Sequence, residues 1–198
     1  MAGGIGAGPL RFHTAVGEIP LTVQEVDGCM RATLTSVETQ IKEMPADLRV
    51  RLRQALRLSD GDLDPSLALL PSYAGNRHPV VRLATAQALA AGDCDFAQLA
   101  ALMAEQGWSA TVNLVSRIAD TRFEARNPFP PGGVREDAAT GSAAASLGGY
   151  LRHLGELPLP GEVAVLQGHH MGRPSDLTVS IPARGGIGGS GTAVPLAR

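Results

Sequence analysis

Apolar and polar positions alternate along the first part of the chain with the spacing of β-strands. Short apolar segments at 10–14, 19–26 and 30–34 are separated by turn residues, so we expect three strands there. The dipeptide Asp27-Gly28 lies between the second and third segments and favours a tight hairpin turn. The pattern therefore predicts a chain that begins with antiparallel strands.

Helical spacing of apolar residues appears in three later stretches. Residues 45–58 begin at a proline, residues 96–106 end before Gly107, and residues 140–154 are rich in alanine. Residues 59–71, rich in Asp and Pro, are expected to form a loop. The remaining apolar runs are short and predict strands at 80–83, 111–118, 122–126, 162–167, 176–181 and 189–196. The 24 glycines and 14 prolines imply many turns, as in a strand-rich fold.

Four arginines on the first predicted helix allow two interpretations. They could mark an anion-binding site, or they could form the solvated face of an amphipathic helix. We favour the second interpretation, because charged residues at this spacing usually face water. The residues concerned are Arg49, Arg51, Arg53 and Arg57.

The most distinctive stretch is 134–154, in which two carboxylates precede a turn and a helix of very small residues. Glu136 and Asp137 come first, and the helix includes the run Ala-Ala-Ala-Ser at 143–146. A helix of this composition can lie with its backbone against other backbones, deep inside a fold. Free N–H groups near 140–144, together with the positive end of the helix dipole, would form an anion site.

Asp137 has two possible roles beside this helix start. It could cap the helix, or it could face a ligand and accept a hydrogen bond from an amine or hydroxyl, while the N–H groups of Gly141 and Ser142 hold a carboxylate. On the residues alone, capping is the simpler role, and Glu136 is expected to be an exposed neighbour. Ser142 has no recognisable His–Asp relay, so a nucleophilic serine is not expected.

The same segment carries a family resemblance. The motif Glu-Asp-x-Ala-Thr-Gly-Ser-Ala at 136–143, followed by a Gly- and Ala-rich helix that ends in Tyr-Leu, resembles the PhzF-like phenazine-biosynthesis family. Members of that family share the diaminopimelate-epimerase fold. Further motifs agree in order: Arg-Asn-Pro-Phe-Pro-Pro-Gly-Gly at 126–133, Gln-Gly at 167–168, Met-Gly-Arg-Pro-Ser at 171–175 and Gly-Thr-Ala-Val at 191–194. The resemblance extends from about Leu10 onward.

The resemblance implies an α+β fold of two lobes, each a barrel-like mixed sheet around a central helix. We expect a loose N-terminus at 1–9, a partial N-terminal lobe at 10–75, and a C-terminal lobe at 76–198 with its central helix at about 140–154. In the family, a preceding stretch carries the catalytic glutamate, a Gly-His segment and the central helix of the first lobe. These features have no counterpart before Leu10, so the chain reads as an N-terminally shortened member with an incomplete first lobe.

Three explanations fit this shortened start. The true start lies upstream, or a second chain supplies the missing half, or the protein no longer catalyses; we favour the first. Ala138 stands where the family has a proline, a mild change that loosens the turn. The rival function is a non-catalytic ligand-binding or assembly protein that keeps the anion pocket. Because a half lobe would expose apolar strands, we expect a homodimer.

By resemblance, the activity would be cofactor-independent isomerisation or epimerisation of a small carboxylate-bearing metabolite. A carboxylate removes a proton from carbon and returns it at another position. Asp137 would be the catalytic residue contributed by the C-terminal lobe, where it positions the substrate. Substrate binding would fall to the turn and helix start at Thr140, Gly141 and Ser142.

Two further site candidates come from a Gly-Asn-x-His segment, which in the family lies near the site. Asn76 and His78 are therefore candidate wall residues. The alternative, which we weigh equally, is turn chemistry for Gly75-Asn76 and a surface position for His78.

Composition narrows the possible partners. The net charge is −2 with a pI near 6.2, and no basic block occurs, so nucleic acid is not an expected partner. No apolar stretch reaches the length of a membrane span and no signal peptide is visible, so we expect a cytoplasmic protein without a membrane partner.

Cys29 and Cys94 are isolated, which fits buried thiols in a reducing compartment. The adjacent His169-His170 lack a third ligand in register, so we expect no metal. The family resemblance implies that no cofactor is needed.

Overall fold

The computed structural model describes residues 6–15 and 17–193. Its strands are β1 (Gly8–Thr14), β2 (Gly17–Val26), β3 (Cys29–Glu38), β4 (Gln40–Ile41), β5 (Leu70–Tyr73), β6 (Arg77–Leu83), β7 (Asn113–Ala119), β8 (Arg122–Arg126), β9 (Pro128–Phe129), β10 (Val134–Glu136), β11 (Gly161–Gln167), β12 (Ser175–Ile181) and β13 (Gly186–Ala193). Its α-helices are α1 (Ala46–Ala55), α2 (Ala86–Ala91), α3 (Phe96–Glu105) and α4 (Gly141–Leu154).

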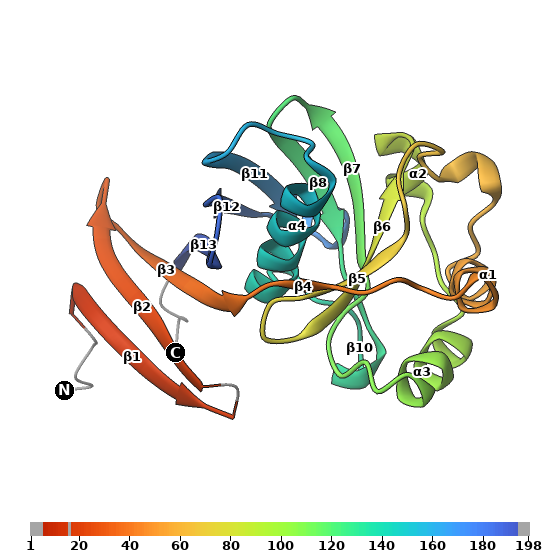
Figure 1. Ribbon diagram of the computed structural model, residues 1–198, viewed down its shortest axis with the longest axis horizontal. Coiled ribbons are helices and arrows are strands. Elements are labelled where there is room, and N and C mark those ends of the chain that lie inside the picture. Colours follow the sequence, from red (N-terminus) through yellow and green to blue (C-terminus); the bar gives the residue numbers. More distant parts are fainter. Residues whose placement is uncertain (1–5, 16, 194–198) are drawn as a thin grey trace.

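One large mixed sheet runs through the molecule in the order β1-β2-β3-β13-β12-β11-β8-β7-β6-β5-β4 (Figure 1). Neighbours are antiparallel except β11 with β8 and β6 with β7, which are parallel. Parallel neighbours need long crossovers, and α4 lies in the first crossover while α2 and α3 lie in the second. The α+β class is confirmed. Over the described residues, however, β1 and β4 remain at opposite ends of the order, so the sheet is open and does not close into a barrel.

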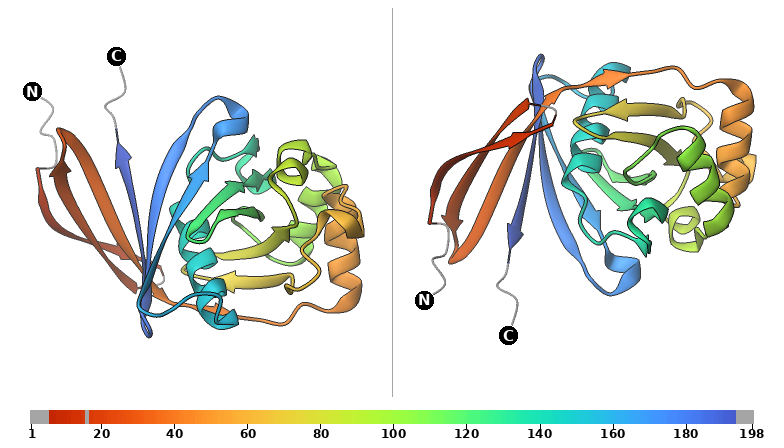
Figure 2. Two further views of the ribbon diagram at one scale, coloured as in Figure 1. Left: turned by 90° about the horizontal axis from the view of Figure 1, so that it is seen from above. Right: turned by 90° about the horizontal axis from the view of Figure 1, so that it is seen from below.

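Helix α4 lies within the curve of this sheet (Figures 1 and 2). Every residue from Ala143 to Leu151 is buried, as the composition of the helix predicts. Small residues are required because the strands come very close: a Cβ at Gly148 would lie 2.8 Å from Ile187 Cγ2, and one at Gly149 would lie 2.8 Å from Thr39 Cβ. The helix contacts β12 and β13 as well as β5 and β6, so the sheet bends around it.

A second layer of helices covers the opposite face of the sheet. Helices α1, α2 and α3 form one apolar cluster with Val81 and Leu83 of β6, whereas Val80 belongs to the cluster around α4. Side chains of a strand alternate between its two faces, so His78 and Arg82 share the α4 side with Val80. Strand β6 thus presents polar groups along the buried helix.

The first three strands form an N-terminal ribbon (residues 8–38) that leans away from the body (Figures 1 and 2). In the sheet, this ribbon joins the body through the pairing of β3 with β13. Asp27 and Gly28 have φ angles of 52° and 74°, which confirms the tight hairpin turn predicted there. Farther along, β5 and β6 pair on either side of Gly75, so the sheet continues across the expected lobe boundary, and the division at that point stays a prediction.

Strand β5 and helix α2 are among the elements that the sequence did not predict. Strand β5 begins inside the predicted loop at 59–71 although it contains Pro71, because pairing with β6 supplies its register. Helix α2 is too short to show a helical period, and its start is fixed by the Thr85 hydroxyl, which accepts a hydrogen bond from the N–H of Ala88 at 3.0 Å.

Several expectations about the ends and the surface can also be placed. Part of the predicted loose N-terminus lies outside the described residues. The predicted end of the last strand, at 194–196, lies entirely outside them. Cys29 is exposed rather than buried, because it lies at the tip of the ribbon, while Cys94 is buried; both thiols are free. Within the described ranges, no helix is long and apolar enough to cross a bilayer.

The arginines on and after α1 bind carboxylates at the surface. This arrangement supports the solvated interpretation, since exposed ion pairs of this kind contribute little to stability. The pairs are Arg49 with Glu43, Arg51 with Glu105, Arg53 with Asp60, and Arg57 with Asp93 and Asp95.

Replacing Gly148 with alanine is expected to destabilise the fold by about 1–2 kcal/mol. The new Cβ would lie 2.8 Å from Ile187 Cγ2 and 2.9 Å from Val179 Cγ1. This overpacking should outweigh the roughly 1 kcal/mol that alanine gains over glycine inside a helix. Urea unfolding at pH 7 measures the difference. Gly141→Ala is the matched control, because a Cβ there meets nothing within 4 Å. An unchanged or raised midpoint for Gly148→Ala would contradict the close packing of α4.

Candidate functional site

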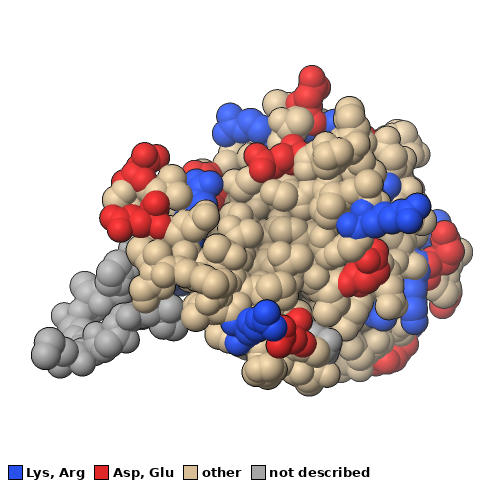
Figure 3. All heavy atoms as spheres, turned by 60° about the vertical axis from the view of Figure 1, so that its left-hand side comes forward, with Lys and Arg blue, Asp and Glu red and all other residues tan. Residues whose placement is uncertain are grey.

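A cleft of about 380 Å³ opens between the N-terminal ribbon and the first turn of α4. Phe12 and Leu34 of the ribbon contribute apolar lining, while Gly75 and Asn76 of the β5–β6 turn and Ser142 of α4 contribute polar groups. Figure 3 brings this side of the molecule forward and shows a broad surface without Lys, Arg, Asp or Glu, with charged side chains at its margins. A few polar groups in an apolar cleft are the usual arrangement of a small-molecule site. A hollow of about 370 Å³ beside α1 is lined by Arg49, Arg53 and Arg82, and by none of the residues of the 136–143 motif.

The Ser142 hydroxyl is hydrogen-bonded to His78 on the side that faces the protein interior. The Ser142 Oγ lies 3.0 Å from His78 Nε2, although the two residues are 64 positions apart in the sequence. His78 is fully buried, so the surface position considered for it is wrong. Asn76 is exposed in the turn, and Gly75 has a φ of 99°, as the turn interpretation of these two residues requires.

The far side of the imidazole is fixed by the segment that leads into β7. His78 Nδ1 lies 3.0 Å from both the carbonyl oxygen and the hydroxyl of Thr111. The Thr111 hydroxyl in turn donates to Asn127 Oδ1 at 2.7 Å. Burial, with no carboxylate partner, lowers the pKa of His78 from 6.5 to about 4, and the backbone hydrogen bond with Thr111 opposes this only in part. His78 is therefore neutral at pH 7.

Gln167, at the end of β11, shapes the turn that precedes α4. Its Nε2 donates to the Asp137 carbonyl at 2.8 Å and to the Thr140 hydroxyl at 2.9 Å, and its Oε1 accepts from the Thr140 N–H at 3.1 Å. The next residue must be glycine, because a Cβ at Gly168 would lie 2.1 Å from the Arg173 carbonyl oxygen. The Gln-Gly motif thus has a structural role that the sequence did not reveal.

Asp137 does not cap α4. Its Oδ2 accepts a hydrogen bond from the Thr140 hydroxyl at 2.8 Å, and within the described residues it bonds to no helix N–H. The capping interpretation is therefore wrong. The N–H groups of Gly141, Ser142 and Ala143 likewise have no protein acceptor in the part of the chain that the structure describes, which leaves them for water or a ligand.

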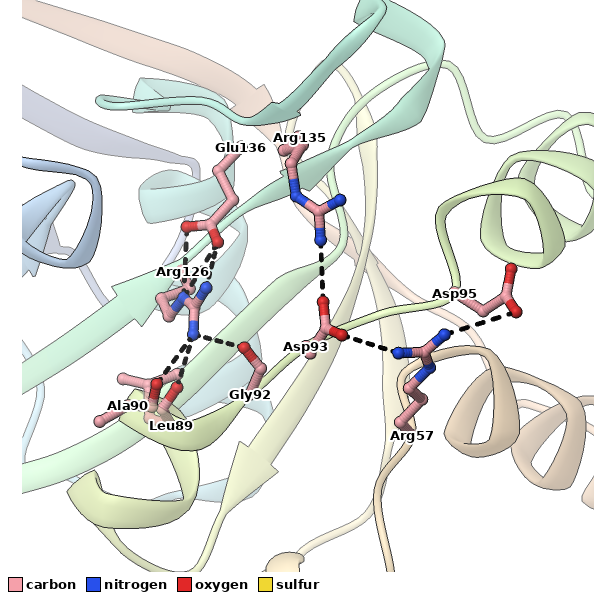
Figure 4. Close-up of polar contacts among 9 residues, drawn as sticks. All are labelled: Arg57, Leu89, Ala90, Gly92, Asp93, Asp95, Arg126, Arg135 and Glu136. Atoms are coloured by element: carbon pink, nitrogen blue, oxygen red, sulfur yellow. Dashed lines mark hydrogen bonds and ion pairs between the residues drawn. The ribbon is translucent and has the colours of Figure 1, made fainter.

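Glu136 is only 17% exposed, so its expected position as an exposed neighbour is wrong. Both of its carboxylate oxygens accept hydrogen bonds from Arg126 (Figure 4). The same guanidinium donates through Nη1 to the carbonyls of Leu89, Ala90 and Gly92 at the end of α2. Arg126 thereby ties α2 to β10 and anchors the backbone immediately before Asp137.

The structure divides the candidate residues into two neighbouring groups. Ser142 and Asn76 line the cleft, with His78 behind Ser142. Asp137 and Thr140 are joined to each other in the turn before α4, and they do not line the cleft themselves. Gly141 is exposed at the start of the helix between the two groups.

Other side chains near this turn can also be placed. Asn113 supports the first turn of α4 by donating to the Ala143 carbonyl at 2.9 Å, and no sequence signal indicated this role. His170 pairs with Glu124 at 3.0 Å. Among residues 6–15 and 17–193, no cluster of three His, Cys, Asp or Glu side chains could hold a metal ion.

Acidification is expected to destabilise the fold through His78. In the unfolded chain the imidazole binds a proton near pH 6.5, but in the folded protein only near pH 4. The contribution of neutral His78 to the free energy of unfolding is therefore fully present above pH 6.5 and is lost as the pH falls towards 4. The loss is on the order of 3 kcal/mol, at about 1.4 kcal/mol per pH unit. Denaturant unfolding at several pH values measures this slope, which His78→Gln should reduce. His153→Asn is the control, because His153 is exposed on α4. Equal slopes for the parent and His78→Gln would refute the assignment.

Comparison with known proteins agrees with the motifs and the fold. A family model described as "Phenazine biosynthesis-like protein" (PhzC-PhzF) matches residues 2–197. A Deinococcus radiodurans protein named uncharacterized isomerase is 30% identical over 181 residues, which are 89% of this chain and 58% of that protein. A Pseudomonas chlororaphis trans-2,3-dihydro-3-hydroxyanthranilate isomerase is 31% identical over 167 residues, 84% of this chain and 56% of that protein. The chain thus spans little more than half the length of these relatives.

Solved structures show the same fold. A Bacillus anthracis phenazine biosynthesis protein of the PhzF family superimposes with a TM-score of 0.79 at 18% identity, covering 98% of this chain and 68% of that one. A Pseudomonas aeruginosa protein described as a predicted epimerase superimposes with a TM-score of 0.78 at 24% identity, covering 99% and 67%. With a family match over nearly its whole length, this chain belongs to the PhzC-PhzF family of phenazine biosynthesis-like proteins.

Proposed function

We propose that this chain supplies one half of a cofactor-independent isomerase or epimerase site that acts on a small carboxylate-bearing metabolite. The observation that carries the proposal is the position of the family motif at 136–143, which forms the turn and helix start beside the cleft. Family membership and relatives named as isomerases support the same reaction class.

The reaction class requires no change in atoms or in oxidation state overall. In an isomerisation, a C–H bond breaks and its electron pair forms a new double bond, while the electron pair of an existing double bond moves to a second carbon and forms a C–H bond with the returned proton. In an epimerisation, the proton returns to the same carbon on its opposite face. In the proposed site, Asp137 accepts a hydrogen bond from an amine or hydroxyl of the substrate, through the carboxylate oxygen that Thr140 does not use. The unbonded N–H groups at the start of α4 receive the substrate carboxylate.

The acid–base carboxylate is, in this proposal, supplied from outside the present sequence. Thr140 engages one carboxylate oxygen of Asp137, so Asp137 has one oxygen left to position a substrate and is not suited to carry the whole proton transfer. A positioned general acid–base group typically contributes about 10²–10⁴-fold to a rate. The chain alone should therefore act slowly.

Deuterium exchange tests this proposal. The chain would be incubated in D₂O with trans-2,3-dihydro-3-hydroxyanthranilate, both alone and fused behind an N-terminal extension taken from the Pseudomonas chlororaphis relative. We expect the fusion to incorporate deuterium into the substrate carbon at least about 100-fold faster than the chain alone. Asp137→Asn in the fusion should slow incorporation by about 10-fold or more, because it weakens a charge-assisted hydrogen bond to the substrate.

Asp120→Asn is the matched control, because Asp120 lies in the β7–β8 turn, where its carbonyl accepts hydrogen bonds from Arg117 and its carboxylate makes no hydrogen bond or ion pair within the described residues. Equal rates for the chain alone and the fusion would refute the need for a second half. No incorporation by the folded fusion would favour the rival function, a ligand-binding protein without catalysis.

A further inference from the structure

The direction of the Ser142 hydroxyl follows from the buried groups behind it. A serine hydroxyl has one proton to donate and two lone pairs that accept. Ser142 Oγ lies 3.0 Å from His78 Nε2 and also lines the cleft, so it has a partner inside the protein and a face towards a ligand. Which of these receives the proton depends on the tautomer of His78.

The contact with the Thr111 carbonyl fixes that tautomer. His78 Nδ1 lies 3.0 Å from the Thr111 carbonyl oxygen, which can only accept a hydrogen bond. It also lies 3.0 Å from the Thr111 hydroxyl, whose own proton is donated to Asn127 Oδ1 at 2.7 Å. Both partners of Nδ1 are therefore acceptors, and Nδ1 must carry the proton. In a neutral imidazole, Nε2 then has a bare lone pair.

The Ser142 proton consequently goes to His78 Nε2, and only lone pairs remain for the cleft. We propose that His78 is a positioning residue that fixes Ser142 as a hydrogen-bond acceptor, so that the ligand group beside Ser142 must be a donor such as an amine, an ammonium or a hydroxyl. The proposal rests on the proposed function for the placement of a ligand in this cleft, and it assigns a donor group of that ligand to the Ser142 hydroxyl.

Burial enforces this direction. His78 is 0% exposed, and Thr111 and Asn127 are each 1% exposed, so none of them can turn to water. Moving the proton from Nδ1 to Nε2 would leave the Nδ1 lone pair facing the Thr111 carbonyl oxygen, and two buried acceptors without a proton between them are costly. A freely rotating serine would serve a carboxylate and an amine alike. The contact between His78 Nδ1 and the Thr111 carbonyl removes that choice, so a substrate carboxylate has to bind the backbone N–H groups at the start of α4 rather than the Ser142 hydroxyl.

Nitrogen NMR of the whole chain labelled with ¹⁵N-histidine tests the tautomer. We expect His78, one of the five histidines, to show a protonated Nδ1 and a bare Nε2 at pH 7. Its signals are assigned by their loss in His78→Gln. Ser142→Ala should shift only the Nε2 signal, because that nitrogen loses its hydrogen bond. Ser146→Ala is the matched control one turn along α4, where the hydroxyl donates to the Ala143 carbonyl. A protonated Nε2, or no shift with Ser142→Ala, would overturn the proposal.

Ligand binding tests the consequence. Titration of the chain with 2-aminobenzoate and with benzoate compares two carboxylates that differ in one donor. We expect 2-aminobenzoate to bind about 3- to 10-fold tighter, the range for one net hydrogen bond. Ser142→Ala should abolish this preference, and Ser146→Ala should keep it. Equal affinities in the parent, or no binding of 2-aminobenzoate, would overturn the inferred ligand class. Failure of deuterium exchange with this preference intact would count against the isomerase proposal alone.

Discussion

The complete burial of one helix governs the rest of this structure. No position from Ala143 to Leu151 faces water, so the helix can hold only apolar or very small side chains where strands approach it. Gly148 and Gly149 mark the closest approaches, at which even a methyl group would collide with Ile187 or Thr39. A helix enclosed in this way needs a sheet that curves, and the contacts of α4 with β12 and β13 on one side and β5 and β6 on the other meet that need.

The candidate site follows from how β6 and α4 lie beside each other. Alternate residues of β6 face the helix, so the strand carries one polar group near each end of it. His78 meets Ser142 at the start of α4, and Arg82 binds Glu156 just beyond its end, with both Nη1–oxygen distances at 3.0 Å. Polar residues on a buried strand face require partners, and here the helix termini supply them. The cleft thus lies at the start of α4, where the polar residue of β6 is bonded to the Ser142 hydroxyl and not to a carboxylate.

Local signals in the sequence predict much of the fold but few of the hydrogen bonds that build the site. The buried helix and the Asp27-Gly28 hairpin follow from composition and turn chemistry, which act within a few residues. The link between Ser142 and His78 spans 64 positions and leaves no periodic trace, so a serine without a visible relay proved to have a histidine partner. The burial of Glu136 is also a long-range effect, because it depends on hydrogen bonds from Arg126 on another strand. The local sequence around Glu136 therefore predicted an exposed position.

The two walls of the cleft differ in how firmly they are held: one is a buried helix, and the other is a ribbon attached to the sheet along one strand. The backbone amides of α4 from Ala144 to Leu151 are hydrogen-bonded in a buried stretch, so they exchange with solvent hydrogen only when the core opens. The N-terminal ribbon is attached to the body sheet through β3 and β13, and its Phe12 and Leu34 remain 46% and 37% exposed. Such a ribbon can separate from β13 at a much lower free energy than global unfolding requires. Moderate heating would therefore widen the cleft from the ribbon side while Ser142 and His78 keep their geometry.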